Sequence, residues 1–166
     1  MAESLDQRIS RFTSIFEEHI QDISQLNGRG NHVNHYRRVL YVTVLDALAK
    51  VACPNAGNRQ LMVDLLSRFS EWKEFDRISL PHLVKLLKLI SEPKFEPLSQ
   101  YAAKQFQTWI GGDVVTLDRD PPYKDISGLW PPDNEYKFPI KDINKNVQLE
   151  SLQHAHLFYN HRNSLV

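Results

Sequence analysis

The spacing of apolar residues near the N-terminus constrains the fold more than any other feature of the sequence. Between residues 5 and 26, apolar side chains recur every three or four positions, with polar and charged side chains between them. This period matches the turn of an α-helix and not the two-residue repeat of a strand. The segment therefore predicts an amphipathic helix that buries one face against another element. Its apolar residues are Leu5, Ile9, Phe12, Ile15, Phe16, Ile20, Ile23 and Leu26.

Similar patterns predict helices over most of the remaining chain. A glycine-containing turn after Leu26 ends the first helix, and a second helix is expected from Asn31 to about Cys53. Its middle, residues 39 to 45, is apolar on all sides, which predicts the buried centre of the fold. Further helices are expected at residues 58–69, between Ser79 and Pro93, between Pro97 and Gly111, and at residues 147–166. The predicted fold class is all-α, a bundle of about five to six helices forming one domain over residues 1–166.

The segment from residue 111 to about residue 146 interrupts the helical pattern. It contains five of the nine prolines and several aromatic residues, including Trp130. Because disordered linkers are poor in aromatic residues, we expect this loop to pack against the bundle. A loop of this length is uncommon in a compact domain, so it is either functional or holds a short β-strand or hairpin. Val114 to Leu117 has the composition of such a strand.

Composition excludes several classes of protein. The 20 basic and 20 acidic side chains balance, which argues against the basic surface of a domain that binds duplex nucleic acid. Apolar runs are much shorter than the roughly 18 residues of a membrane span. The N-terminus carries Glu3 and Asp6 where a signal peptide has basic residues, and the single cysteine, Cys53, predicts a buried free thiol. We therefore expect a cytoplasmic protein that does not enter a membrane.

The last predicted helix carries a cation on its apolar side. At about 100° per residue, Arg162 falls within the arc formed by the apolar residues of this helix. A charge buried there alone is strongly destabilising. Arg162 therefore needs a carboxylate partner, polar groups of a neighbouring subunit or an anionic ligand, unless it extends past the helix end into solvent.

The sequence around this arginine resembles the signature of HEPN domains (higher eukaryotes and prokaryotes nucleotide-binding). In that signature an arginine, usually followed by a polar residue, precedes a histidine on the last long helix. Arg162 and Asn163 match the first two elements, and the position of the histidine would follow Val166, the last residue. The resemblance also implies an all-helical fold built on long antiparallel helices.

The resemblance implies a metal-independent endoribonuclease of the toxin or defence type. It implies an RNA substrate, a homodimer whose two subunits form the site together, an antitoxin protein as partner, and no cofactor. Arg162 would clamp the scissile phosphate, and Asn163 would orient that phosphate or its partner side chain. The motif histidine is absent, and His156 and His161 are only weak substitutes, so we expect catalysis to be lost or reduced by about 10²- to 10⁴-fold.

The apolar end of the last helix leads to a separate expectation. Leu165 and Val166 provide neither the glycine nor the additional basic residue typical of a helix C-terminus. We therefore expect the chain to be a shortened form of a longer one.

Two other interpretations stay open. In the first, the chain is a non-catalytic HEPN-like interaction or dimerisation module in which Arg162 stabilises an interface. In the second, a helical bundle binds a small molecule and uses the loop containing Trp130 as a lid.

The remaining histidines and basic residues predict no separate site. His154, like His156 and His161, is expected on a solvated polar face of the last helix. His32 and His35 have no cysteine or carboxylate at metal-ligand spacing, so no metal is expected there. The pair Arg37 and Arg38 on the second helix is expected to be solvated, with phosphate contact as the alternative.

Overall fold

The computed structural model describes residues 3–28, 31–55, 57–90, 92–109, 116–131, 137–139 and 146–165. Its contacts group into two compact units, one formed by Met1–Leu65 with Asn160–Val166 and the other by Leu66–Tyr159. Within the described ranges the regular structure is helical apart from one short β-hairpin and two isolated bridges, which confirms the all-α fold class. No helix in these ranges is both long and apolar enough to cross a membrane.

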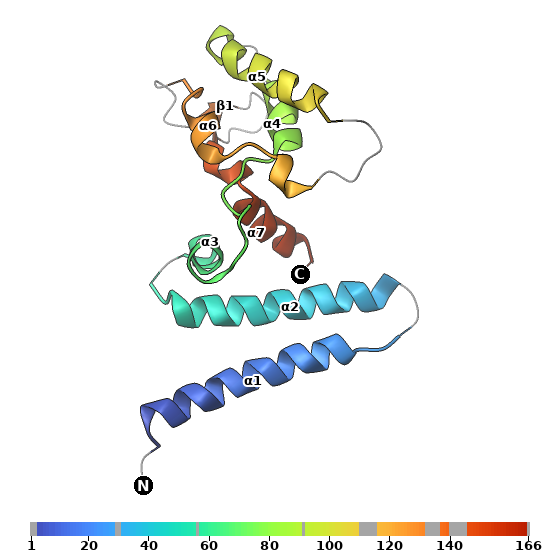
Figure 1. Ribbon diagram of the computed structural model, residues 1–166, viewed down its shortest axis with the longest axis vertical. Helices are drawn as coiled ribbons and strands as arrows, with labels where there is room; N and C mark the ends of the chain where they lie inside the picture. Colours follow the sequence, from blue (N-terminus) through green and yellow to red (C-terminus); the bar gives the residue numbers. More distant parts are fainter. Residues whose placement is uncertain are drawn as a thin grey trace. The chain divides into compact units, whose positions relative to one another are not determined.

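Two long helices dominate the first unit. Helix α1 (Leu5–Gln25) and helix α2 (Asn31–Ala52) run in opposite directions and form a helical hairpin (Figure 1). Helix α3 (Asn58–Phe69) follows. All three begin and end close to where the spacing of apolar residues predicts.

Local hydrogen bonds explain the limits of α1. Ser4 and Gln7 form a capping box, in which the Gln7 backbone N–H donates to Ser4 Oγ at 3.2 Å and the Ser4 N–H donates to Gln7 Oε1 at 2.9 Å. At the other end, Arg37 Nη2 donates to the carbonyl oxygens of Ser24 at 3.0 Å and Leu26 at 2.6 Å. Arg37 therefore caps α1 from α2, a role that sequence analysis did not assign to it.

The connection between the helices leaves little room for a side chain at Gly28. A Cβ atom at Gly28 would lie 2.5 Å from Val33 Cγ2, closer than two carbon atoms can approach. Val33 lies in the first turns of α2, so a larger residue at position 28 would force either the Val33 side chain or the turn to shift.

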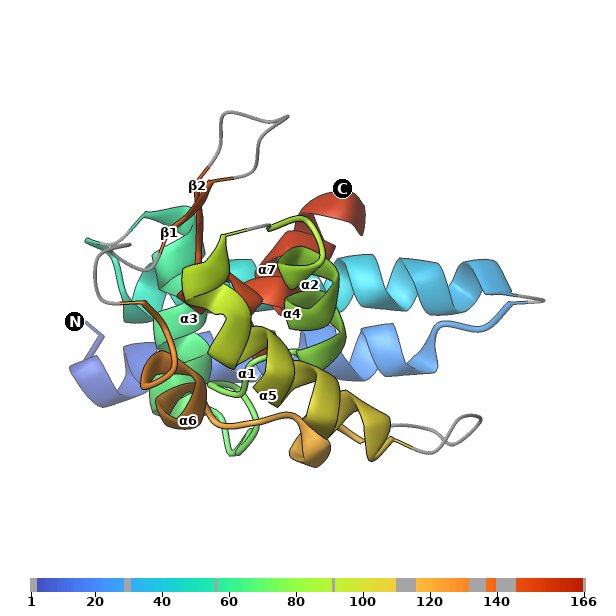
Figure 2. The same ribbon diagram turned by 90° about the horizontal axis from the view of Figure 1, so that it is seen from above.

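The second unit is built from shorter elements around helix α4 (Leu80–Leu87) and helix α5 (Glu96–Gln107), which pack side by side (Figure 2). A β-hairpin of β1 (Lys137–Pro139) and β2 (Asn146–Gln148) pairs in antiparallel register, with Phe138 opposite Val147. The part of the expected strand at Val114 and Val115 lies outside the described residues. The other elements are the 3₁₀ helices η1 (Pro93–Phe95), η2 (Leu117–Arg119) and η4 (Leu149–Leu152), helix α6 (Tyr123–Ser127) and helix α7 (His154–Leu165).

The last helix begins later than predicted. Residues expected to open it instead form β2 and η4, and α7 starts at His154. The connector before α4 explains this difference, because Ile78 bridges to Gln153 and the His154 N–H donates to the Arg77 carbonyl at 3.0 Å. Backbone pairing with a distant segment thus overrides the local helical period.

The largest hydrophobic core lies in the second unit and not, as predicted, at the middle of α2. Phe95 and Trp130 pack edge to face within it, with ring centroids 5.6 Å apart. Trp130 is 5% exposed, which confirms that the described part of the proline-rich loop packs down. In the middle of α2, by contrast, Val42 is buried but Leu40 is 40% exposed. The prediction that the middle of α2 is the buried centre of the fold was wrong, because the helices packed against α2 leave part of its surface exposed.

Candidate functional site

Arg162, the residue singled out from the sequence, is held by a carboxylate of the same unit. Its Nε donates to Asp46 Oδ2 at 2.8 Å, and its Nη2 also donates to that oxygen. The side chains of Arg162 and Asp46 are 22% and 23% exposed. A carboxylate partner is one of the alternatives that the position of Arg162 on its helix left open.

The second motif residue lies beside the guanidinium. Arg162 Nη1 donates to Asn163 Oδ1 at 2.6 Å, and one turn earlier Arg59 Nη2 donates to Asn160 Oδ1 at 3.2 Å. The end of α7 therefore has one polar contact with α2, through Arg162, and another with α3, through Asn160. We call the residues of these contacts the polar cluster, namely Asp46, Arg59, Asn160, Arg162 and Asn163.

The space next to this cluster is small. A cavity of about 30 Å³ lies between Asp46, Lys50, Asn58 and Arg162, which is room for only a few water molecules. A ribose phosphate does not fit into it. As it stands, the arrangement locks the end of α7 onto α2 and presents no open phosphate site.

Comparison with protein-family models, with curated protein sequences and with solved structures finds no match to this chain. The HEPN resemblance therefore stays a prediction.

Other residues considered from the sequence occupy different environments. His161 is exposed and His156 is partly buried on α7, and the side chain of His35 is exposed on α2. The described residues contain no group of His, Cys, Asp and Glu side chains that could hold a metal ion. Cys53 is a buried free thiol, as predicted.

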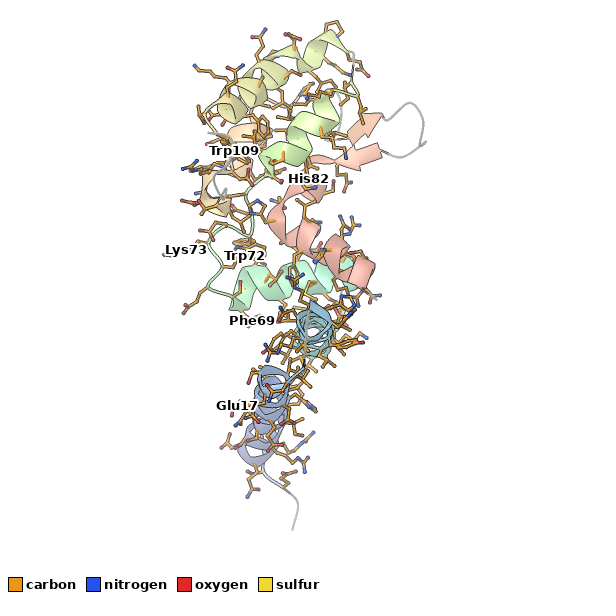
Figure 3. All side chains as sticks on the ribbon, turned by 90° about the vertical axis from the view of Figure 1, so that its right-hand side faces the viewer. Glu17, Phe69, Trp72, Lys73, His82 and Trp109 are labelled. Carbon is orange, nitrogen blue, oxygen red and sulfur yellow. The ribbon has the colours of Figure 1, made fainter. Side chains whose placement is uncertain are left out.

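His154 differs from its predicted place on a solvated face. It is 5% exposed, and its Nε2 lies 2.7 Å from Asp120 Oδ2, which is also buried. Trp72, labelled in Figure 3, stacks on the His154 ring with centroids 6.2 Å apart. Because Asp120 Oδ1 accepts the Leu80 N–H at 2.8 Å, this pair joins the starts of α4 and α7 and has a structural role.

A second candidate site is the apolar surface of the α1–α2 hairpin. We call it the hairpin face, and define it by the large apolar side chains that are exposed there. Two apolar grooves of about 450 and 400 Å³ run along it, one on each side of Ile15. Its residues are Leu5, Ile9, Phe12, Ile15, Leu26, Leu40 and Val51.

Breaking the Arg162–Asp46 ion pair should cost a modest amount of stability. For a partly exposed pair with charged hydrogen bonds, we expect Arg162→Ala and Asp46→Ala each to lower the free energy of unfolding by about 1–2 kcal/mol. The double variant should lose clearly less than the sum of the two, because the second change removes a group that has already lost its partner. Urea denaturation followed by circular dichroism measures all three.

The exposed Arg38 on α2 provides the matched control, and Arg38→Ala should leave the denaturation midpoint nearly unchanged. If the double variant loses the full sum of the unfolding free energies lost by Arg162→Ala and Asp46→Ala, the two side chains do not interact. The guanidinium would then be available to a ligand.

Proposed function

We propose that this protein is a non-catalytic dimerisation module, in which the hairpin face binds the same face of a second copy of the chain. The observation that carries the proposal is the exposure of an amphipathic helical hairpin. Of the described side chains of α1, only Ile23 is buried, although the helix carries a continuous apolar stripe. Exposed apolar patches of this kind mark interaction surfaces.

Helix α2 supports the same conclusion. Its middle is apolar on all sides, yet Leu40 there is 40% exposed, and Val51 near the end of the helix is 58% exposed. A helix of this composition is stable in water when both of its sides are covered. Helix α1, helix α3 and the end of α7 contact parts of its surface, and a second hairpin would cover the exposed part.

The dimensions of the hairpin face are adequate for a dimer. A helix of 21 residues is about 30 Å long, and two packed helices are about 20 Å wide. Pairing two such faces would bury roughly 600 Å² on each copy, or about 1,200 Å² in total, the lower end of the range for specific interfaces. Two helical hairpins joined in this way form a four-helix bundle, a common arrangement of amphipathic helices.

The ribonuclease expected from the resemblance has less support. Its phosphate clamp, Arg162, would have to leave Asp46, and the neighbouring cavity of about 30 Å³ would have to open. Cleavage of RNA by this chain that Arg162→Ala abolishes would favour the ribonuclease over the dimerisation module.

Sedimentation equilibrium tests the proposed dimer. We expect the chain to sediment as a dimer at micromolar concentrations, and Ile9→Glu/Ile15→Glu to sediment as a monomer, because two charges would be buried between apolar side chains. Circular dichroism checks that the variant keeps its helices.

Leu89→Glu is the matched control, since Leu89 is 60% exposed but belongs to the other unit. It should remain dimeric. A chain that is monomeric at 100-fold higher concentration, or an Ile9→Glu/Ile15→Glu variant that still dimerises, would overturn the proposal.

A further inference from the structure

Charged residues along one side of α1 are ordered so that the positive charges of its first half are matched by negative charges in its second half. Arg8, Arg11, Ile15, Glu18 and Asp22 follow one another at intervals of three, four, three and four residues, so they lie along one side of the helix. Two positive charges precede Ile15 and two negative charges follow it. We call these five residues the charge row.

The charge row borders the hairpin face. Arg8, Arg11 and Ile15 line one of its two grooves, and Ile15 and Asp22 line the other. All four charged side chains are exposed. They are therefore placed to meet any helix that lies on this face.

Within the described part of the chain these charges are little used. Arg11 forms an exposed ion pair with Glu3 at 3.1 Å, whereas Arg8, Glu18 and Asp22 have no ion pair with another described residue. Asp22 also lies in the last turn of α1, where a negative charge opposes the helix dipole. Stability of α1 alone thus gives no reason for this arrangement.

A second copy in antiparallel orientation does give a reason. If a two-fold axis passes by Ile15, position 8 of one helix faces position 22 of the other, and position 11 lies within one residue of position 18. Each arginine then faces a carboxylate of the other copy, and the two Ile15 side chains meet at the centre. A parallel pair would instead bring Arg8 to Arg8 and Asp22 to Asp22.

We propose that Arg8, Arg11, Glu18 and Asp22 make the hairpin face self-complementary, so that it selects a second copy of this chain in antiparallel orientation with Ile15 at the two-fold axis. This inference rests on the proposed dimerisation and adds its orientation and the residues that give it specificity. Ion pairs at the edge of an interface contribute mainly orientation and selectivity, while the apolar residues contribute affinity.

Charge reversal tests the pairing. Arg8→Glu/Arg11→Glu makes the charge row acidic throughout, and Glu18→Arg/Asp22→Arg makes it basic throughout. With four attractive contacts turned repulsive, each variant alone should dimerise about 100-fold more weakly than the unaltered chain. An equimolar mixture of the two should form a heterodimer, measured by native mass spectrometry. Glu17 lies on α1 (Figure 3) and, at about 100° per residue, on a different side from the charge row. Glu17→Arg is therefore the control and should dimerise normally.

A variant with all four charges exchanged tests the orientation. Arg8→Glu/Arg11→Glu/Glu18→Arg/Asp22→Arg keeps opposite charges facing each other in an antiparallel homodimer, so it should dimerise as the unaltered chain does. Mixed with the unaltered chain, it should form no heterodimer, because like charges would face each other. In a parallel arrangement the heterodimer would be preferred, and that result would overturn the inference.

These outcomes separate the two proposals. Charge variants that dimerise normally, together with a monomeric Ile9→Glu/Ile15→Glu variant, would remove the charge pairing and leave the dimerisation module intact. If the unaltered chain is monomeric, both the dimerisation module and the charge pairing are wrong.

Discussion

Asp120→Ala should lower the free energy of unfolding by about 3–5 kcal/mol. The Asp120 carboxylate is 4% exposed, accepts the Leu80 N–H at 2.8 Å and lies 2.7 Å from His154 Nε2. Alanine would leave both the backbone donor and the imidazole buried without a partner, and each unsatisfied group is costly. Chemical denaturation monitored by circular dichroism measures the loss.

Two other variants show that the carboxylate itself is responsible. Asp118→Ala removes an exposed aspartate two positions earlier and should change the denaturation midpoint far less. Asp120→Asn keeps an oxygen for the Leu80 N–H and should fall between the unaltered chain and Asp120→Ala. If Asp120→Ala changed the denaturation midpoint as little as Asp118→Ala is expected to, the buried pair would add no stability.

Helices whose limits depend on nearby residues could be predicted from the sequence. The capping box of Ser4 and Gln7, the glycine turn after α1 and the spacing of leucines in α3 all act within a few positions. For this reason α3 was predicted at residues 58–69, where the structure has it. Burial of Cys53 followed from its apolar neighbours in the same way.

The contacts that determine the candidate sites could not be predicted, because they join distant parts of the sequence. Asp120 and His154 are 34 positions apart, and Asp46 and Arg162 are 116 positions apart. The position of Arg162 on its helix did predict that the cation needs a partner. Nothing local to α7 identified Asp46, and nothing local to His154 distinguished a buried imidazole from a solvated one.

The hairpin face shows a different gap between sequence and structure. The apolar stripe of α1 and the apolar middle of α2 predict burial, and the structure leaves much of both exposed. The spacing of apolar residues identifies which side of a helix is buried, but it does not tell whether the element that buries it belongs to the same chain. Under the proposed function, that element is the hairpin of a second copy.

Phe95→Ala should also lower the free energy of unfolding by about 3–5 kcal/mol. The ring is fully buried, and it packs against Trp130 with centroids 5.6 Å apart. Truncation removes the transfer free energy of the ring and leaves a cavity that the surrounding helices cannot fill. Phe106→Ala is the matched control, because Phe106 lies on the following helix α5 and is 41% exposed.

The same measurement decides where in a single copy the stabilising core lies. If the middle of α2 were the buried centre, Leu40→Ala would be as costly as Phe95→Ala. Because Leu40 is 40% exposed, we expect its truncation to cost a monomer about 1 kcal/mol or less. In a dimer the cost of Leu40→Ala should rise, since the second hairpin would cover this side chain, whereas the cost of Phe95→Ala should stay the same. If the loss of unfolding free energy caused by Leu40→Ala rises with protein concentration, while that caused by Phe95→Ala does not, the stability of the hairpin is linked to the proposed dimer.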